Sequence, residues 1–261
     1  VAVIGAGQMG AGIAQVAAAH GNAVLLADID LATANKAKAG IEKGLTKLVA
    51  KEKIAAAEAE ATLARITPVA DYARFAEAAF VIEAATEREE VKRTIFEKAG
   101  AVLGADAILA TNTSSIPITR MAAHASDPAR FIGLHFFNPV PLMPLIEVIP
   151  GLATSDETAR RTRAFAESLG KQVVLSQDEP GFIVNRILLP MINEAVFVLG
   201  QGTAGIADID AAARLGLNHP MGPLQLADFI GLDTCLEIVR VLHSSTGDSK
   251  YRPAPLLVKY V

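Results

Sequence analysis

Two polar residues interrupt apolar stretches in the middle of the chain. His135 lies within FIGLHFFNP, and Glu147 lies within PLIEVIP, twelve residues later. A buried carboxylate without a partner is costly, and a buried imidazole needs partners for its ring nitrogens. If the two side chains meet, the carboxylate holds one imidazole tautomer and leaves the other nitrogen as a general base. The alternative is that each residue is satisfied separately, because spacing alone does not establish contact.

Hydroxyl and amide side chains lie beside other apolar segments. TNTSSIP supplies Ser114 and Ser115 after an expected strand end, where side chains reach ligands in open α/β sheets. In the structural alternative, at least one of these serines caps the helix expected near Ile118. Asn138 follows the aromatic pair and Asn185 lies in GFIVNR. Each of these amides, taken alone, is more typical of a structural role than a catalytic one.

A glycine-rich turn directly follows the first expected strand. The run VAVI leads into GAGQMG, in which Gly5, Gly7 and Gly10 have G-x-G-x-x-G spacing, and a helical pattern comes next. In a dinucleotide-binding turn the first glycine permits the tight turn and the second lets the backbone approach a pyrophosphate. The third permits close packing of helix on strand. The helix N-terminus then offers free N–H groups to the anion.

An acidic residue ends the second expected strand. Asp28 comes 18 residues after Gly10, where a carboxylate can accept hydrogen bonds from the ribose of an adenosine. Asp28 repels a 2′-phosphate and no Arg follows it, so the sequence favours NAD over NADP. A plain glycine turn is the structural alternative, and strand, helix and acid at these distances argue against it. FAD is the alternative cofactor on these residues alone.

The first part of the chain alternates short β-branched runs with helical patterns, which indicates a parallel sheet covered by helices. Between the second and third expected strands lies a long helical region with a basic outer face. Thr154–Glu157 has the spacing of a capping box that opens a helix through about residue 169. The expected strands are 1–4, 23–28, 80–85, 107–111, 131–137, 145–149 and 172–175.

The β pattern disappears after Pro180–Gly181. The rest predicts helices near 182–200, 206–216, 222–230 and 231–245. We therefore expect an α/β fold: a Rossmann-like, doubly wound, mostly parallel sheet over residues 1–178, which binds NAD. A smaller all-helical domain is expected over residues 179–261.

Composition excludes several functional classes. The chain has 261 residues, 51% of them hydrophobic, and a formal net charge of −4, so it can bury a core but lacks the cationic excess of a nucleic-acid-binding protein. Its single Cys235 excludes a disulfide framework and a thiolate metal site, so we expect a cytoplasmic protein without a metal. No stretch approaches the roughly 20 apolar residues that cross a bilayer. Both ends look trimmed.

Taken together, GAGQMG, ATNTSS, GLHFFNPVPLMPLIEVI, PGFIVNR and HPMGPLQLADFIGLD resemble the L-3-hydroxyacyl-CoA dehydrogenase family, particularly its bacterial 3-hydroxybutyryl-CoA branch. The resemblance covers essentially the whole chain, and HFFNP with PGFIVNR is far more specific than the glycine loop. It implies reversible oxidation of a short-chain (S)-3-hydroxyacyl-CoA by NAD, with His135 and Glu147 as an acid–base pair. Ser114 and Asn185 match family residues that contact the reacting oxygen.

The same match implies binding residues for both ligands. Glu87, Lys92 and Asn138 correspond to positions that line the nicotinamide and ribose side. The full set implied for the cofactor is Gly5, Gly7, Gln8, Met9, Gly10, Asp28, Glu87, Lys92, Ser114 and Asn138. The set implied for the acyl-CoA is Ser114, Lys47, Lys51, Lys53 and Asn185.

The chain departs from the family pattern at two places. Gly44 stands where members often have a CoA-contacting Ser, and the basic, glycine-rich tail of the family is absent after LLVKYV. The CoA phosphates are expected to meet the basic face formed by Lys43, Lys47, Lys51 and the nearby Lys53. The alternative is that these lysines form a solvated helix face.

The resemblance also implies that the helical domain, residues 179–261, contributes to substrate binding and forms a homodimer. Two other functions compete: a sugar-acid 3-dehydrogenase of the lens-crystallin-related branch, and a non-enzymatic NAD-binding structural protein. The segment HFFNPVPLMPLIEVI favours the acyl-CoA branch. Intact His135, Glu147, Ser114 and Asn185 argue against a protein without turnover, which has no need of an acid–base pair in apolar strands.

Overall fold

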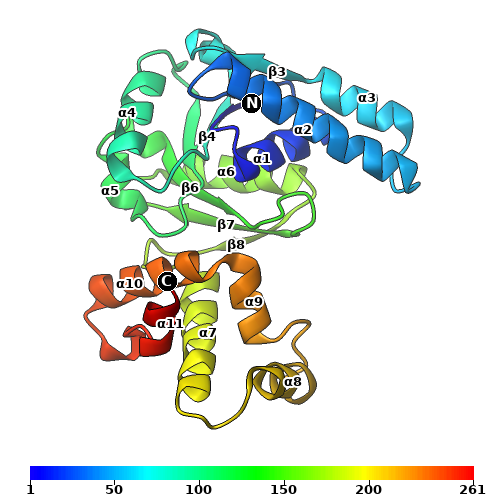
Figure 1. Cartoon of the computed structure of the whole chain (residues 1–261). Coiled ribbons are helices and arrows are strands. Elements are labelled where there is room, and N and C mark those ends of the chain that lie inside the picture. The colour runs from blue at the N-terminus through cyan, green and yellow to red at the C-terminus, as the bar shows by residue number, and fades with distance from the viewer. The chain divides into compact units, whose positions relative to one another are not determined.

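The structure is a computed structural model that describes all residues from 1 to 261. The chain divides into two compact units, Val1–Asp178 and Glu179–Val261 (Figure 1). The first contains every strand of the molecule, and the second is entirely helical. These features confirm the expected fold class.

The first unit is built on one eight-stranded sheet with the order β3-β2-β1-β4-β5-β6-β7-β8. Strands β1 to β6 run parallel, β7 is antiparallel to β6, and β8 is parallel to β7. Strand order reverses between β1 and β4, so ligands are expected beyond the carboxyl ends of these two strands. The strands are β1 (Ala2–Ile4), β2 (Val24–Ala27), β3 (Ile66–Val69), β4 (Phe80–Glu83), β5 (Ile108–Thr111), β6 (Phe131–Phe136), β7 (Leu145–Pro150) and β8 (Gln172–Leu175).

Helices cover both faces of this sheet (Figure 1). One face carries α1 (Gln8–Ala19), α2 (Leu31–Ala50), α3 (Ala56–Ala64) and α6 (Asp156–Ser168), and the other carries α4 (Glu89–Gly100) and α5 (Ile118–Ala122). Side chains alternate between the faces along each strand. On β6, for example, Phe131 contacts Phe96 of α4, whereas Ile132 belongs to the core beneath α1 and α6. Burial on both faces explains the uninterrupted apolar strands.

The sequence analysis missed β3. The segment Ile66–Val69 has only four residues and includes Pro68, which weakens a strand signal. Pro68 is tolerated because β3 pairs only with β2, at the edge of the sheet. The region expected to be one long helical stretch therefore consists of α2, α3 and this edge strand.

The expected capping box of α6 is also wrong. Ser155 is the N-cap, and its Oγ accepts a hydrogen bond from the Thr158 N–H at 3.2 Å. The Thr154 hydroxyl instead donates to the Phe131 carbonyl at 2.6 Å, which ties the start of β6 to the loop before α6. Glu157 pairs with Arg160 on the surface.

The second unit packs its helices around α7 (Val184–Gly200), drawn in yellow in Figure 1. The others are α8 (Ile206–Gly216), α9 (Pro223–Ile230), α10 (Leu232–Thr246) and α11 (Pro255–Tyr260). Burial, together with Asp233, raises the pKa of the Cys235 thiol to about 11, so this residue is an inert part of the core. No helix in the chain is long and apolar enough to cross a membrane.

Candidate active site

The glycine loop has the geometry that its sequence predicts. Gly5 adopts φ +97°, a conformation that glycine favours, and its N–H donates to the Ala27 carbonyl at 2.9 Å. A Cβ at Gly10 would lie 1.7 Å from the Gly5 carbonyl oxygen. A Cβ at Gly7 would meet nothing within 4 Å, and Gly7 lies directly before α1. An open backbone at a helix N-terminus fits a pyrophosphate.

The glycines provide a matched pair of variants. Gly10→Ala is expected to lower the melting temperature, because its methyl group cannot fit against Gly5 unless α1 moves away from β1. Gly7→Ala is expected to keep the wild-type melting temperature but to weaken NADH binding about tenfold, because its methyl group occupies the space over the loop. Thermal unfolding and fluorescence titration with NADH separate the two effects. Equal melting temperatures for both variants would contradict this division of roles.

Asp28 lies at the edge of the glycine loop. One of its carboxylate oxygens accepts the Ala6 N–H at 2.5 Å, and the other accepts the Ile29 N–H at 2.7 Å. The side chain is half-buried at the end of β2, next to β1. The carboxylate therefore joins the end of one strand to the glycine loop at the end of the next.

His135 and Glu147 meet across neighbouring strands. They are partners in the antiparallel register of β6 and β7, and His135 Nδ1 lies 2.7 Å from Glu147 Oε2. Glu147 is fully buried and His135 is 6% exposed. Both residues point to the face of the sheet that α4 and α5 cover, because their neighbours Leu134, Phe136, Ile146 and Val148 belong to the opposite core. The structure thus brings the two side chains into direct contact.

Glu87 accepts several hydrogen bonds from the loop that carries the two serines. Its Oε1 accepts hydrogen bonds from the hydroxyls of Thr113, Ser114 and Ser115 at 2.6, 3.2 and 2.9 Å and from the Ser114 and Ser115 N–H groups. Partial burial would raise the pKa of Glu87, but Lys92 and the hydrogen bonds from this loop outweigh it. They hold the pKa below its ordinary value. Glu87 is therefore an ionised acceptor at neutral pH.

The expected serine cap of α5 is wrong. Pro117 is the N-cap, and the Ile118 and Thr119 N–H groups each donate to the Asp178 carboxylate at 2.7 Å. Because Asp178 lies about sixty positions away in sequence, the local pattern did not reveal it. The serine hydroxyls are left to bind Glu87 and other groups.

Asn138, Gln8 and Gly7 line one cavity of about 530 Å³ in the first unit. The cavity lies between the start of α1, the inner side of α2 and the loop 138–141. Met9 packs instead against the apolar core. Lys47, Lys51 and Lys53 are exposed toward the far end of α2, beyond the cavity. Asn185 lies in the first turn of α7, in the second unit.

The sequence analysis missed Glu83, Thr111 and Thr113, which support this site. Glu83 lies within FVIEAA, so an acidic residue inside an apolar strand marks it in the same way that it marked Glu147. Thr111 and Thr113 carry no comparable signal, because threonine is common at strand ends.

Comparison with known proteins gives matches over the whole chain. Residues 1–179 match the family model of the 3-hydroxyacyl-CoA dehydrogenase NAD binding domain, and residues 181–261 match its C-terminal domain. A 3-hydroxybutyryl-CoA dehydrogenase from Bradyrhizobium diazoefficiens is 54% identical over 100% of this chain and 89% of its own length. A probable 3-hydroxybutyryl-CoA dehydrogenase from Bacillus subtilis is 49% identical over 100% and 91%. The crystal structure of (S)-3-hydroxybutyryl-CoA dehydrogenase from Ralstonia eutropha superposes with a TM-score of 0.96 at 47% identity, covering 99% of this chain and 91% of that one.

Proposed function

The chain belongs to the 3-hydroxyacyl-CoA dehydrogenase family, with NAD as its cofactor, and from that premise we propose that it interconverts (S)-3-hydroxybutyryl-CoA and acetoacetyl-CoA. The observation that carries the proposal is the buried contact between His135 and Glu147. This pair lies near the carboxyl end of β6, and the glycine loop begins at the carboxyl end of β1. Because β1 and β6 run parallel, both lie on the same side of the sheet. The names of the relatives support the short acyl chain.

The proposed chemistry assigns the proton to His135. Bound NAD supplies the hydride acceptor for C3 of the substrate. His135 takes the proton of the 3-hydroxyl group, and Glu147 offsets the positive charge that arises on the imidazole. In the reverse direction the imidazolium protonates the forming alkoxide. We assign Ser114 and Asn185 to orienting that oxygen, a role that their hydrogen-bonding groups support.

A single assay tests the reaction class, the cofactor and the acyl group together. Loss of NADH absorbance is expected on adding acetoacetyl-CoA, with little oxidation of NADPH and no reduction of NAD by a small sugar acid. Turnover of the sugar acid alone would favour the lens-crystallin-related alternative. NADH binding without any turnover would favour the non-enzymatic alternative and would overturn the proposal.

Asp28 is expected to set cofactor affinity and the preference for NAD. Asp28→Ala should weaken NADH binding about tenfold, because it removes charged hydrogen bonds to the ribose. Asp28→Asn keeps an acceptor for the Ala6 N–H but loses the charge, so it should retain more NADH affinity while repelling NADPH less. Fluorescence titrations with both nucleotides measure these changes. Wild-type NADH affinity in Asp28→Ala would remove Asp28 from the cofactor site.

We assign the exposed lysines toward the far end of α2 to the acyl-CoA. These cations lie beyond the cavity that the glycine loop and Asn138 line, and they support a ligand with terminal phosphates. The double variant Lys47→Glu/Lys51→Glu should raise KM for acetoacetyl-CoA up to about tenfold, less at high salt. KM for acetoacetyl-pantetheine, which lacks the nucleotide phosphates, should not change. Lys98→Glu, exposed on α4, is the control, and an equal effect there would sink the assignment.

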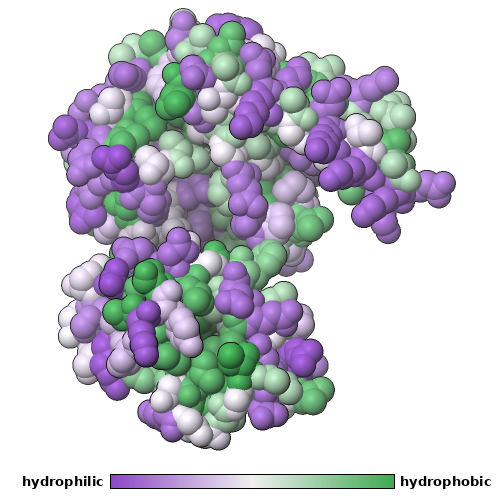
Figure 2. All heavy atoms as spheres, viewed as in Figure 1, coloured by the Kyte–Doolittle hydropathy of each residue, from purple (hydrophilic) through white to green (hydrophobic).

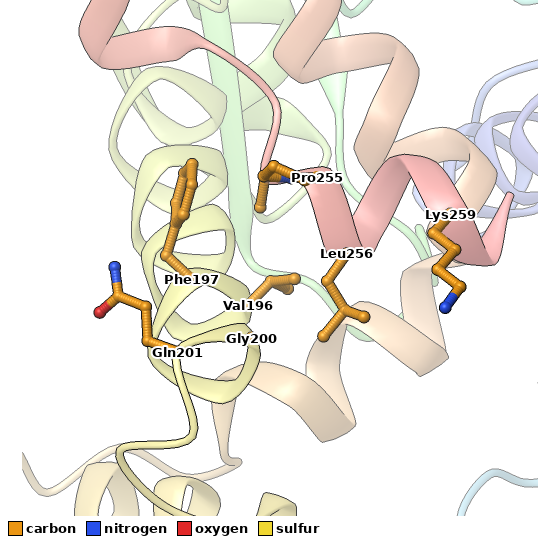
Figure 3. Close-up of a pocket in the computed structure, with 8 residues that line it drawn as sticks. Val196, Phe197, Gly200, Gln201, Pro255, Leu256 and Lys259 are labelled. Atoms are coloured by element: carbon orange, nitrogen blue, oxygen red, sulfur yellow. The ribbon is translucent and has the colours of Figure 1, made fainter.

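We further propose a cytoplasmic homodimer that forms through the second unit. Figure 2 shows hydrophobic residues gathered on the face of this unit in view. Among the large side chains of the unit, Ile187, Leu215, Phe229 and Tyr260 are each at least 62% exposed. A groove of about 360 Å³ between α7 and α11 adds Phe197 and Leu256 to the apolar surface (Figure 3). Exposed apolar area of this kind supports contact with a second copy. Small-angle scattering should give twice the monomer mass, and a monomeric mass would refute the dimer.

A further inference from the structure

Besides the contact between His135 and Glu147, the first unit buries a lysine against a glutamate. Lys92 Nζ lies 2.8 and 2.7 Å from the two carboxylate oxygens of Glu83. The Lys92 side chain is 2% exposed, and Glu83 is fully buried. Burying such a pair removes both charges from water, and apolar residues of similar size often stabilise a fold equally well. A role in fold stability alone therefore explains this pair poorly.

Glu83 occupies a central place at the ligand-binding edge of the sheet. It is the last residue of β4 and is in register with Ile4 of β1, the residue before the glycine loop. On its other side it is in register with Thr111 of β5, which is itself in register with Gly133 of β6. His135 follows two residues later on the same face of β6. Glu83 thus lies between the cofactor loop and the acid–base pair.

Hydrogen bonds fill both oxygens of the Glu83 carboxylate. Oε1 accepts from the Ala85 N–H at 2.8 Å as well as from Lys92, and Oε2 accepts from the Thr111 hydroxyl at 2.7 Å as well as from Lys92. The carboxylate therefore joins β4, β5, α4 and the turn after β4. The same turn packs on the glycine loop, since a Cβ at Gly5 would lie 2.6 Å from the Ala84 carbonyl oxygen.

Lys92 transmits this anchoring to the serine loop. Its Nζ lies 3.7 Å from Glu87 Oε2, while Glu87 Oε1 accepts hydrogen bonds from Thr113, Ser114 and Ser115. A lysine side chain is flexible and has three donors. Because Glu83 binds the ammonium through both of its oxygens, the position of Nζ is fixed within ion-pair distance of Glu87.

We propose that Glu83 is the positioning residue of the cofactor site: it fixes the Lys92 ammonium and, through Lys92 and Glu87, the place of the Ser114 loop. The proposal rests on the function proposed above and on the cofactor set that the family resemblance implies, which includes Glu87, Lys92 and Ser114. Glu83 itself is buried beneath Lys92 and does not touch the reactants. Residues that orient metal ligands change affinity or activity about tenfold or more when altered, and we expect an effect of that order here.

Glu83→Gln tests the proposal, because it keeps the size of the side chain and removes the charge. We expect the Kd for NADH to rise about tenfold and its KM to rise in parallel. At saturating NADH, kcat should fall by a smaller factor than the Kd rises, because the Ser114 loop is displaced while the His135–Glu147 pair is unchanged. Glu97→Gln is the matched control, since Glu97 lies on α4, the helix that carries Lys92, in an exposed pair with Arg93, and it should leave both quantities unchanged.

Folding and binding are separated by a second variant. If Glu83→Gln does not fold, Thr111→Val removes one hydrogen bond to Glu83 and keeps its charge, and the Kd for NADH should rise about threefold. An unchanged Kd in folded Glu83→Gln, or in Thr111→Val where the first variant fails to fold, overturns the proposal. A fall in kcat with unchanged Kd also overturns it. NADH titration needs no acyl substrate, so failure of the proposed reaction is distinguished from failure of this inference.

Discussion

His135→Gln is expected to reduce turnover of acetoacetyl-CoA by about 10²- to 10⁴-fold while leaving the Kd for NADH within about twofold of wild type. Glutamine can still donate a hydrogen bond to Glu147, so the register of β6 and β7 should persist. It cannot, however, take or return a proton near neutral pH. The loss should therefore appear in kcat, because a step of the reaction and not the binding of NADH is affected.

Steady-state kinetics with acetoacetyl-CoA, together with NADH titration, measure this prediction. His124→Gln is the control, because His124 lies just beyond α5 and outside the site. Unchanged turnover in His135→Gln would refute the role of His135 as acid and base. Loss of NADH binding together with turnover would instead indicate a structural role for the residue.

The glycine loop, Asp28 and the order of strands and helices other than β3 were predictable, because their signals are local. A tight turn, a close contact and a strand-end acid each need one residue type at one spacing. The contact between His135 and Glu147 was not predictable from the residues alone. It depends on the antiparallel pairing of β6 with β7 and on their register, and a shift of one residue would place the two side chains on opposite faces.

Long-range partners explain the errors. Thr154 and Ser114 have the local spacing of helix caps, but the Phe131 carbonyl and Glu87 bind them instead. The N-terminus of α5 is bound by Asp178, which reaches it from the end of the first unit. Local hydrogen-bonding propensity is thus overridden where folding brings in a distant acceptor, which is a backbone carbonyl for Thr154 and a carboxylate for Ser114 and α5. Glu83 is a different case, because its signal is local. An acidic residue inside an apolar strand marks Glu83 as clearly as it marks Glu147.

Replacing Glu147 is also expected to reduce turnover strongly. Glu147→Gln is expected to lower kcat by about 10²- to 10³-fold with a near-native fold, because the amide has the same shape as the carboxylate and leaves no unpaired buried charge. The variant loses the negative charge that stabilises an imidazolium at His135. Its amide group can also donate to Nδ1 of His135, which would place the ring proton on Nε2, the nitrogen that must act as the base.

The pH–rate profile distinguishes this role from simple orientation of the ring. Without the carboxylate the imidazolium is less stable, so the acid limb of the profile for oxidation of 3-hydroxybutyryl-CoA should move to lower pH. If Glu147 only orients the ring, kcat falls and the limb stays in place. Circular dichroism and thermal unfolding of Glu147→Gln establish that the fold persists. A wild-type profile with wild-type kcat in a folded variant would show that the buried contact at 2.7 Å is structural, and the acid–base function of the pair would have to be abandoned.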